Sequence, residues 1–300
     1  MGPRPIDLHL KALRELGVKI TEAHGFLECD VVKLQGSEIH LDYPSVGATE
    51  NTMLIAVMAK GITTIRNAAK EPEIVDLQEY LNKMGAKVRG GGTSEIIIEG
   101  VGRLHRVEHK IMPDRIVAGT LAIAGAIAGG EILLKNVVID HIKPILVKLK
   151  EAGCLVLEKD HNLKIKTAQR LKAVEMTKTL PYPGFPTDMQ AQFMSLMTVT
   201  QGTSIIAETV FENRYKHVDE LTRMGAKIKI DGRVAVVQGV KKLTGAKVCA
   251  KDLRGGAALV LAGLVAEGVT IVEHISHIDR GYDQLDKMLE RLGAYVHRID

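Results

Sequence analysis

The chain has no tryptophan and only four phenylalanines among its 300 residues, so its core must be built from aliphatic side chains. It also lacks any tract rich in lysine and arginine, and its net charge of +4 is small. Both observations argue against nucleic acid as a partner, although a slight positive balance suits an anionic small substrate. At this length the chain can form one large domain or two ordinary ones.

Long hydrophobic runs are missing as well. The longest, residues 116–130, is rich in glycine and alanine and too short to cross a bilayer, so we interpret it as a buried helix. The first residues lack the apolar segment of a signal peptide, and we expect a cytoplasmic protein with no membrane partner. The three cysteines are far apart and none has metal-ligand spacing. We expect buried, reduced thiols at Cys29, Cys154 and Cys249, with no metal and no cofactor.

One glycine recurs at almost constant spacing, each time between an amphipathic helical pattern and a strand-like segment. The successive gaps are 68, 68, 72 and 68 residues. Glycine adopts the left-handed conformation that ends many helices without a Cβ penalty, so each position predicts a helix C-terminus. The recurrence predicts a protein built from repeats. The five positions are Gly17, Gly85, Gly153, Gly225 and Gly293.

A second set of glycines, Gly61, Gly130, Gly202 and Gly268, ends four more apolar helical patterns. Each unit is therefore helix–strand–helix–strand–strand, which is βαβαββ in circular order. The first helix of each unit is apolar on all sides and should be buried, whereas the second should face solvent. We predict an inside-out α/β barrel fold in two domains, residues 1–112 and 113–300, of which the N-terminal one is incomplete. Four full units begin near Gly47, Asp114, Asp188 and Asp252.

Turn formers and capping residues open each of the buried helices. Helix capping is the simplest interpretation of Ser45, Thr49, Asp114, Thr187, Asp188 and Asp252. Helix N-termini also present free N–H groups and a positive dipole end, which attract anions. If the pseudosymmetry of the repeats directs several such termini into one cleft, that cleft should bind phosphates and carboxylates.

Arginines occupy similar positions in the repeats. Arg115 and Arg254 lie in first helical turns, and Arg214 and Arg280 lie in matched turns, FENR and HIDRGY. A guanidinium makes two-point contacts with phosphate or carboxylate, so the matched pair points to anion binding rather than to an ordinary surface. Asp188, in the first turn of a buried helix, is the best candidate for a general base.

These segments resemble the enolpyruvyl transferase family, in the branch that acts on UDP-N-acetylglucosamine at the start of peptidoglycan synthesis. The resemblance covers residues 2–299 and is carried by GPRPIDLHL, PSVGATENTM, PTDMQAQFMSL, FENRYKHVDELTRMGA, DLRGGAALVLAGL and HIDRGYDQLDKMLERLGA. It implies two inside-out domains, with UDP-N-acetylglucosamine and then phosphoenolpyruvate bound in the cleft between them. The sugar 3-hydroxyl attacks C2 of phosphoenolpyruvate, and phosphate leaves a tetrahedral intermediate.

The resemblance also implies roles for individual residues. Asp188 would act as the base, with Asp252 helping in proton transfer, while Arg4 and Arg280 would serve catalysis. Arg214, Arg254 and Arg280 would bind phosphoenolpyruvate. The nucleotide sugar would contact Arg4, Pro5, Ile6, Asp7, Leu8, Ser45, Val46, Gly47, Asp188 and Val210.

The family also carries a Lys-Asn pair near its N-terminus and a mobile loop with a reactive cysteine a few residues before GPRP. Neither feature lies in this sequence, and none of its three cysteines occupies the loop position. We therefore expect an N-terminally truncated version that does not catalyse the transfer alone and that would be a monomer at full length. The sequence leaves open the branch that acts on shikimate 3-phosphate and a non-catalytic remnant that binds a UDP-sugar.

Overall fold

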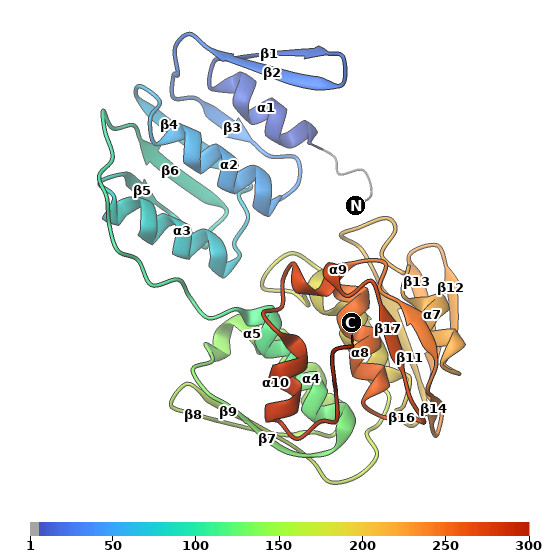
Figure 1. Ribbon diagram of the computed structural model, residues 1–300. Helices are drawn as coiled ribbons and strands as arrows, with labels where there is room; N and C mark the ends of the chain where they lie inside the picture. The colour runs from blue at the N-terminus through green and yellow to red at the C-terminus, as the bar shows by residue number, and fades with distance from the viewer. Residues whose placement is uncertain (1–5, 300) are drawn as a thin grey trace. The chain divides into compact units, whose positions relative to one another are not determined.

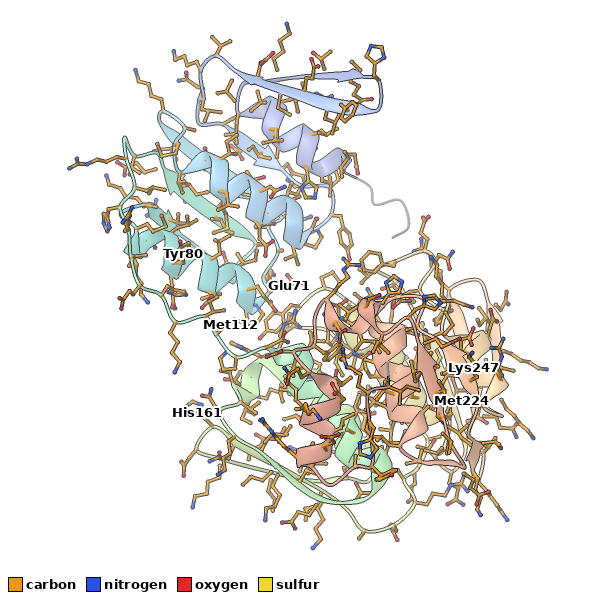
Figure 2. All side chains as sticks on the ribbon, viewed as in Figure 1. Glu71, Tyr80, Met112, His161, Met224 and Lys247 are labelled. Carbon is orange, nitrogen blue, oxygen red and sulfur yellow. The ribbon has the colours of Figure 1, made fainter. Side chains whose placement is uncertain are left out.

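The computed structural model describes residues 6–299, and the chain divides into two compact units (Figure 1). Unit 1 spans Met1–Met112 and also includes Pro181–Pro183. Glu71, which is labelled in Figure 2, is the residue before helix α3. Its Oε1 accepts a hydrogen bond from the backbone N–H of Tyr182 at 3.3 Å. The elements of unit 1 are α1 (Asp7–Glu15), β1 (Val18–Ala23), β2 (Phe26–Val31), β3 (Glu38–His40), α2 (Val46–Ala56), β4 (Ile62–Arg66), α3 (Pro72–Lys83), β5 (Lys87–Arg89) and β6 (Glu95–Glu99).

Unit 2 spans Pro113–Leu180 and Gly184–Asp300. Its first half contains α4 (Arg115–Ala128), β7 (Gly130–Leu134), α5 (Ile139–Glu151), β8 (Leu155–Lys159), β9 (Asn162–Thr167), β10 (Met176–Lys178), a 3₁₀ turn (Thr187–Met189) and α6 (Gln190–Met197). Its second half contains β11 (Thr203–Ala207), α7 (Val218–Arg223), β12 (Lys227–Asp231), β13 (Val234–Gln238), β14 (Leu243–Thr244), β15 (Lys247–Cys249), α8 (Leu253–Gly263), β16 (Ala266–Glu267), β17 (Ile271–Glu273), α9 (Ser276–Asp279) and α10 (Leu285–Arg291).

The sheets repeat along the chain. The strand order β3-β4-β6-β5 in unit 1 recurs as β10-β11-β13-β12 in unit 2, and in both the first pair is parallel and the other pairs are antiparallel. The β7-β9-β8 sheet contains the three antiparallel strands of the same plan. The predicted α/β fold of βαβαββ repeats is therefore confirmed. The fourth repeat is not the full unit that we expected, because no strand follows α10 among the residues described up to Ile299.

The helix ends explain the glycine spacing. All five glycines of the first set have φ between +90° and +101°, and each lies just after α1, α3, α5, α7 or α10. At Gly85, the next N–H, that of Ala86, donates to the carbonyl of Leu81 at 3.0 Å, and three of the other four ends repeat this bond. This pattern is the Schellman C-cap, so the prediction is confirmed. The second set also has positive φ, but α2, α6 and α8 end several residues before Gly61, Gly202 and Gly268.

The first helix of each repeat in unit 2 is buried as predicted. All eight residues of α6 are buried because the helix carries no charge and packs against both α4 and α8. Strands and amphipathic helices surround these inner helices (Figure 1). In unit 1 the expectation fails for α2, since Leu54 is 50% exposed. That helix contacts α1, α3 and the strands β4 and β6, and the face that carries Asn51 and Leu54 stays exposed.

The hairpin β1–β2 is more exposed than the other hairpins of the repeats. All six residues of β2 are exposed, including Cys29, which corrects our expectation of three buried thiols. Within the described residues, β2 pairs with β1 alone, whereas the equivalent strand β6 lies between β4 and β5. Cys154 is buried, and Cys249 is partly buried. No helix between residues 6 and 299 is long and apolar enough to cross a membrane.

We therefore expect amide hydrogen exchange on β2 to be at least about 100-fold faster than on β6, because little buried apolar surface holds β2 in place. Ile96 and Ile98 on β6 are fully buried, whereas Phe26 on β2 is 74% exposed. Exchange measured by NMR or mass spectrometry tests this, with β13 as the internal reference. Equal protection of β2 and β6 would contradict it.

Candidate functional site

The carboxylate of Asp188 lies between two arginines in unit 2. Its Oδ1 accepts a hydrogen bond from Nη2 of Arg214 at 2.5 Å, and its Oδ2 accepts one from Nη2 of Arg254 at 2.9 Å. Asp188 belongs to the 3₁₀ turn before α6, Arg214 to the loop after β11, and Arg254 to the first turn of α8. Residues from three consecutive parts of the repeat array thus meet at one carboxylate. Helix capping is not the role of Asp188, since α6 has no side-chain cap.

The two arginines keep Asp188 ionised. Burial by itself would raise the pKa of this carboxyl group, but the charges and hydrogen bonds of Arg214 and Arg254 together outweigh burial and lower the pKa below its ordinary value. For Arg254, burial would lower the pKa of the guanidinium, and Asp188 with Tyr282 raises it overall. The cluster holds two cations and one anion, and it therefore presents a net positive charge to an incoming ligand.

Both guanidinium groups also pack on aromatic rings. The Cζ atom of Arg214 lies 4.6 Å from the centroid of the Phe211 ring, and that of Arg254 lies 5.6 Å from the Tyr282 ring. Such stacking fixes the plane of a guanidinium and compensates part of its lost hydration. Sequence reasoning missed both rings, although Phe211 stands in FENR and Tyr282 in HIDRGY, beside the arginines that it did select.

The Tyr282 hydroxyl joins three elements inside unit 2. It lies 2.9 Å from Oγ1 of Thr120 on α4, and it accepts a hydrogen bond from Nε2 of Gln192 on α6 at 3.0 Å. The same Nε2 contacts Thr120 Oγ1 at 3.2 Å and the carbonyl of Asp188 at 2.9 Å. Since all three side chains are buried, this polar cluster fixes the starts of the inner helices relative to one another.

The helix starts themselves are capped by carboxylates. Asp114 Oδ1 accepts from the N–H groups of Ile116 and Val117 at 2.7 and 2.9 Å. Asp252 Oδ1 accepts from those of Arg254 and Gly255 at 3.0 and 2.8 Å. The predicted caps at these two positions are confirmed. They also correct the expectation that these termini offer free N–H groups to an anion, because the caps already use them, and the arginines supply the positive charge instead.

A buried histidine lies beside this cluster. His217 is 2% exposed, and its Cβ lies against Gly255. Burial lowers the pKa of the imidazole to about 4, with the charge of Asp252 opposing the shift and that of Arg214 adding to it. The ring is therefore neutral at physiological pH and adds no third cation to the site.

Unit 1 holds the second group of predicted residues. Ser45 precedes α2, and its Oγ accepts a hydrogen bond from the N–H of Ala48 at 3.3 Å, which confirms the predicted cap. Thr49 is not an N-cap, because it lies within α2, four residues after the cap Ser45. Its hydroxyl accepts a hydrogen bond from the N–H of Ala69 at 3.0 Å. A Cβ atom at Gly47 would lie 3.1 Å from the ring of His9 on α1, a residue that sequence reasoning missed.

The remaining predicted residues lie on segments next to these groups. Ile6 stands just before α1, and Asp7 and Leu8 form its first turn, whereas Arg4 and Pro5 lie outside the described residues. Val210 lies in the loop that leads to Arg214. Arg280 follows α9, two residues before Tyr282.

The fold and the site define a transferase of the inside-out βαβαββ type, and comparison with known proteins agrees. Residues 1–289 match the family described as EPSP synthase (3-phosphoshikimate 1-carboxyvinyltransferase). The enolpyruvyl transferase NikO from Streptomyces tendae has a similar structure, with a TM-score of 0.88 and 26% sequence identity over 98% of this chain and 72% of that one.

Relatives with much higher sequence identity than NikO show which branch of the family the chain resembles. UDP-N-acetylglucosamine 1-carboxyvinyltransferase 2 of Caldanaerobacter subterraneus subsp. tengcongensis is 58% identical over this whole chain and 72% of its own length. The enzyme of the same name from Carboxydothermus hydrogenoformans is 55% identical over the same shares of the two chains. The chain therefore belongs to the enolpyruvyl transferase family, in the branch of the UDP-N-acetylglucosamine 1-carboxyvinyltransferases, and the resemblance drawn from its motifs is confirmed. The branch that acts on shikimate 3-phosphate is not favoured.

Proposed function

We propose that the protein serves the transfer of the enolpyruvyl group from phosphoenolpyruvate to the 3-hydroxyl of UDP-N-acetylglucosamine, with release of phosphate. This is the first committed step of peptidoglycan synthesis, and we place it in the cytoplasm, in an enzyme that is a monomer at full length. The observation that carries the proposal is the Asp188 carboxylate held between Arg214 and Arg254. The high identity to enzymes named for this reaction supports it.

Arg214 and Arg254, with Arg280, are the proposed ligands of phosphoenolpyruvate. Its phosphate and carboxylate groups are better partners for two guanidinium groups than a single carboxylate is, since they carry more charge and more acceptor oxygens. Binding would therefore replace Asp188 as the partner of the two guanidinium groups. Without them, the burial of Asp188 raises its pKa, and the carboxylate becomes a stronger base.

In this scheme Asp188 takes the proton of the sugar hydroxyl as its oxygen bonds to C2 of phosphoenolpyruvate, while C3 gains a proton and becomes a methyl group. Phosphate then leaves the tetrahedral intermediate as C3 loses a proton and the C2–C3 double bond forms again, with Asp252, Arg4 and Arg280 assisting. The unpaired state of Asp188 arises only after phosphoenolpyruvate has bound. The base is therefore inactive in the absence of the second substrate.

The nucleotide sugar is assigned to unit 1. Ser45, Val46 and Gly47 form the N-terminal end of α2, whose backbone N–H groups would hold the diphosphate. The residues at the start of α1 and before it complete this proposed site in unit 1. They are Arg4, Pro5, Ile6, Asp7 and Leu8.

Calorimetric titration with UDP-N-acetylglucosamine and, separately, with shikimate 3-phosphate tests the proposal. We expect the nucleotide sugar to bind with a Kd between about 1 μM and 1 mM, the usual range of KM values, and shikimate 3-phosphate not to bind. Gly47→Val should weaken nucleotide-sugar binding by at least about 10-fold, because the added side chain meets the ring of His9 and displaces the N-terminal turn of α2.

Gly102→Val is the matched control, since a Cβ atom there meets nothing within 4 Å. Tight binding of shikimate 3-phosphate, or equal affinity of Gly47→Val and the unmodified protein for the nucleotide sugar, would contradict the proposal.

A further inference from the structure

Glu208 is a buried carboxylate with neutral partners close to the site. It is 1% exposed and follows directly after β11. Its Oε1 accepts hydrogen bonds from Oγ1 of Thr179 and from the N–H groups of Val210 and Phe211, at 2.9, 2.9 and 3.0 Å. Its Oε2 accepts one from Oγ1 of Thr187 at 2.8 Å. A buried carboxylate that receives four such bonds is held in one orientation.

The bond to Thr187 determines how that hydroxyl can act. The Thr187 hydroxyl donates to Oε2 of Glu208, so its proton points toward that carboxylate. The lone pairs of the same oxygen are then free to accept, and one receives Nη1 of Arg214 at 3.0 Å. Arg214 thus holds two adjacent residues at once, Thr187 through Nη1 and Asp188 through Nη2.

Glu208 also fixes the aromatic ring under Arg214. The N–H of Phe211 donates to Glu208, and the Phe211 ring lies 4.6 Å from the guanidinium carbon. The loop from Glu208 to Arg214 is therefore fixed at its start and at its middle. Arg214 therefore has two contacts with residues that Glu208 holds: the hydrogen bond to Thr187 in the plane of the guanidinium, and the Phe211 ring against its face.

We infer that Glu208 is a positioning residue that, through Thr187 and Phe211, fixes the guanidinium of Arg214 for an incoming phosphate or carboxylate group. The inference rests on the proposed function, in which Arg214 exchanges Asp188 for phosphoenolpyruvate. During that exchange Nη1 keeps its bond to Thr187, so the cation does not have to reorganise when the ligand arrives. A donor that is already oriented binds an anion more strongly than one that must first lose its freedom.

Substitutions at Thr187 test this with little change in volume. Thr187→Val removes the hydroxyl, whereas Thr187→Ser keeps it. Glu208→Gln replaces one accepting carboxylate oxygen with an NH₂ group, which donates hydrogen bonds instead of accepting them. Glu212→Gln is the matched control, because Glu212 lies on the same loop, is 88% exposed at its side chain, and pairs with the guanidinium of Arg233 instead of with Thr187 or Arg214.

Two measurements apply to each variant. The first is the titration of the Asp188 carboxyl group, followed by carbon-13 NMR in the free protein. We expect Thr187→Val and Glu208→Gln to raise the Asp188 pKa toward its ordinary value, because a loosened Arg214 pairs with it less well, and Thr187→Ser and Glu212→Gln to leave it unchanged. The second is the affinity for phosphoenolpyruvate at saturating UDP-N-acetylglucosamine, which should fall about 10-fold in Thr187→Val and stay within about twofold in Thr187→Ser.

The possible results distinguish a failure of the proposed function from a failure of the positioning role of Glu208. If the unmodified protein binds neither substrate, the proposed function fails. If it binds both, and Thr187→Val leaves the Asp188 titration and the phosphoenolpyruvate affinity as they were, the positioning role is wrong while the proposed function stands. A change in Thr187→Ser as large as that in Thr187→Val would also overturn the inference, because the hydroxyl would then not be the cause.

Discussion

Gly100→Ala is expected to destabilise unit 1 by about 3 kcal/mol or more, because the added carbon has no space. A Cβ atom at this position would lie 1.5 Å from the carbonyl oxygen of Ala59. The obstacle is backbone and cannot rotate away as a side chain could. The N–H of Gly100 also donates to the carbonyl of Gly61 at 2.9 Å, so moving the strand to relieve the clash would break that bond. Urea unfolding followed by circular dichroism measures the loss.

Gly102→Ala is the matched control for this substitution. It lies two residues further along, a Cβ atom there meets nothing within 4 Å, and its φ is not positive. We expect its free energy of unfolding to stay within about 0.5 kcal/mol of the unmodified value. Equal unfolding midpoints for the two variants would show that the close approach is not rigid. Unit 2 repeats the feature, since a Cβ atom at Gly239 would lie 1.9 Å from the carbonyl oxygen of Thr200.

Asp188→Asn should destabilise unit 2 by about 1–3 kcal/mol at neutral pH, because it leaves Arg214 and Arg254 next to each other without their shared anion. The side chain of Asp188 is 38% exposed, and water therefore screens part of the effect. Thermal or urea unfolding at pH 7 measures the difference. Asp219→Asn is the control, since that aspartate is 83% exposed and lies 3.9 Å from its lysine partner, Lys251.

The same variant has a defined pH dependence. The arginines hold the Asp188 pKa below its ordinary value of 3.8 in the folded protein, so the carboxylate stabilises the fold above the pKa of the unfolded chain. That stabilisation is lost as the pH falls toward and through the lower pKa of the folded state. The difference between Asp188→Asn and the unmodified protein should therefore be constant above about pH 5 and shrink in more acidic solution. A difference that persists unchanged at pH 2 would contradict this assignment.

The repeat architecture could be read from the sequence because its signals are local. A left-handed residue at a helix end needs glycine whatever surrounds it, so Gly85 and its equivalents mark the helices correctly. Burial depends on neighbours that the local pattern does not contain. For this reason the sequence predicted α2 to be buried on every side and Cys29 to be hidden, and both expectations were wrong.

In the candidate site, too, some residues could be predicted from local sequence and others could not. Asp188 and Arg254 could be selected because they stand in the first turns of predicted buried helices, and Arg214 because its turn matches that of Arg280. The structure brings Asp188, Arg214 and Arg254 together. Which of their neighbours support them could not be predicted. Thr187 and Glu208 are 21 residues apart, and Thr120 and Tyr282 are 162 apart, so their pairing depends on how whole repeats pack.

The contact between Thr120, Gln192 and Tyr282 has a thermodynamic consequence for unit 2. Each side chain comes from a different repeat, and each is buried, so the opening of any one repeat breaks buried hydrogen bonds that it shares with the other two. Repeat arrays in which every unit contacts only its neighbours lose cooperativity and unravel from their ends. Here the shared hydroxyl and amide group couple the repeats directly, and unit 2 should melt in one calorimetric transition whose van't Hoff enthalpy equals the heat absorbed.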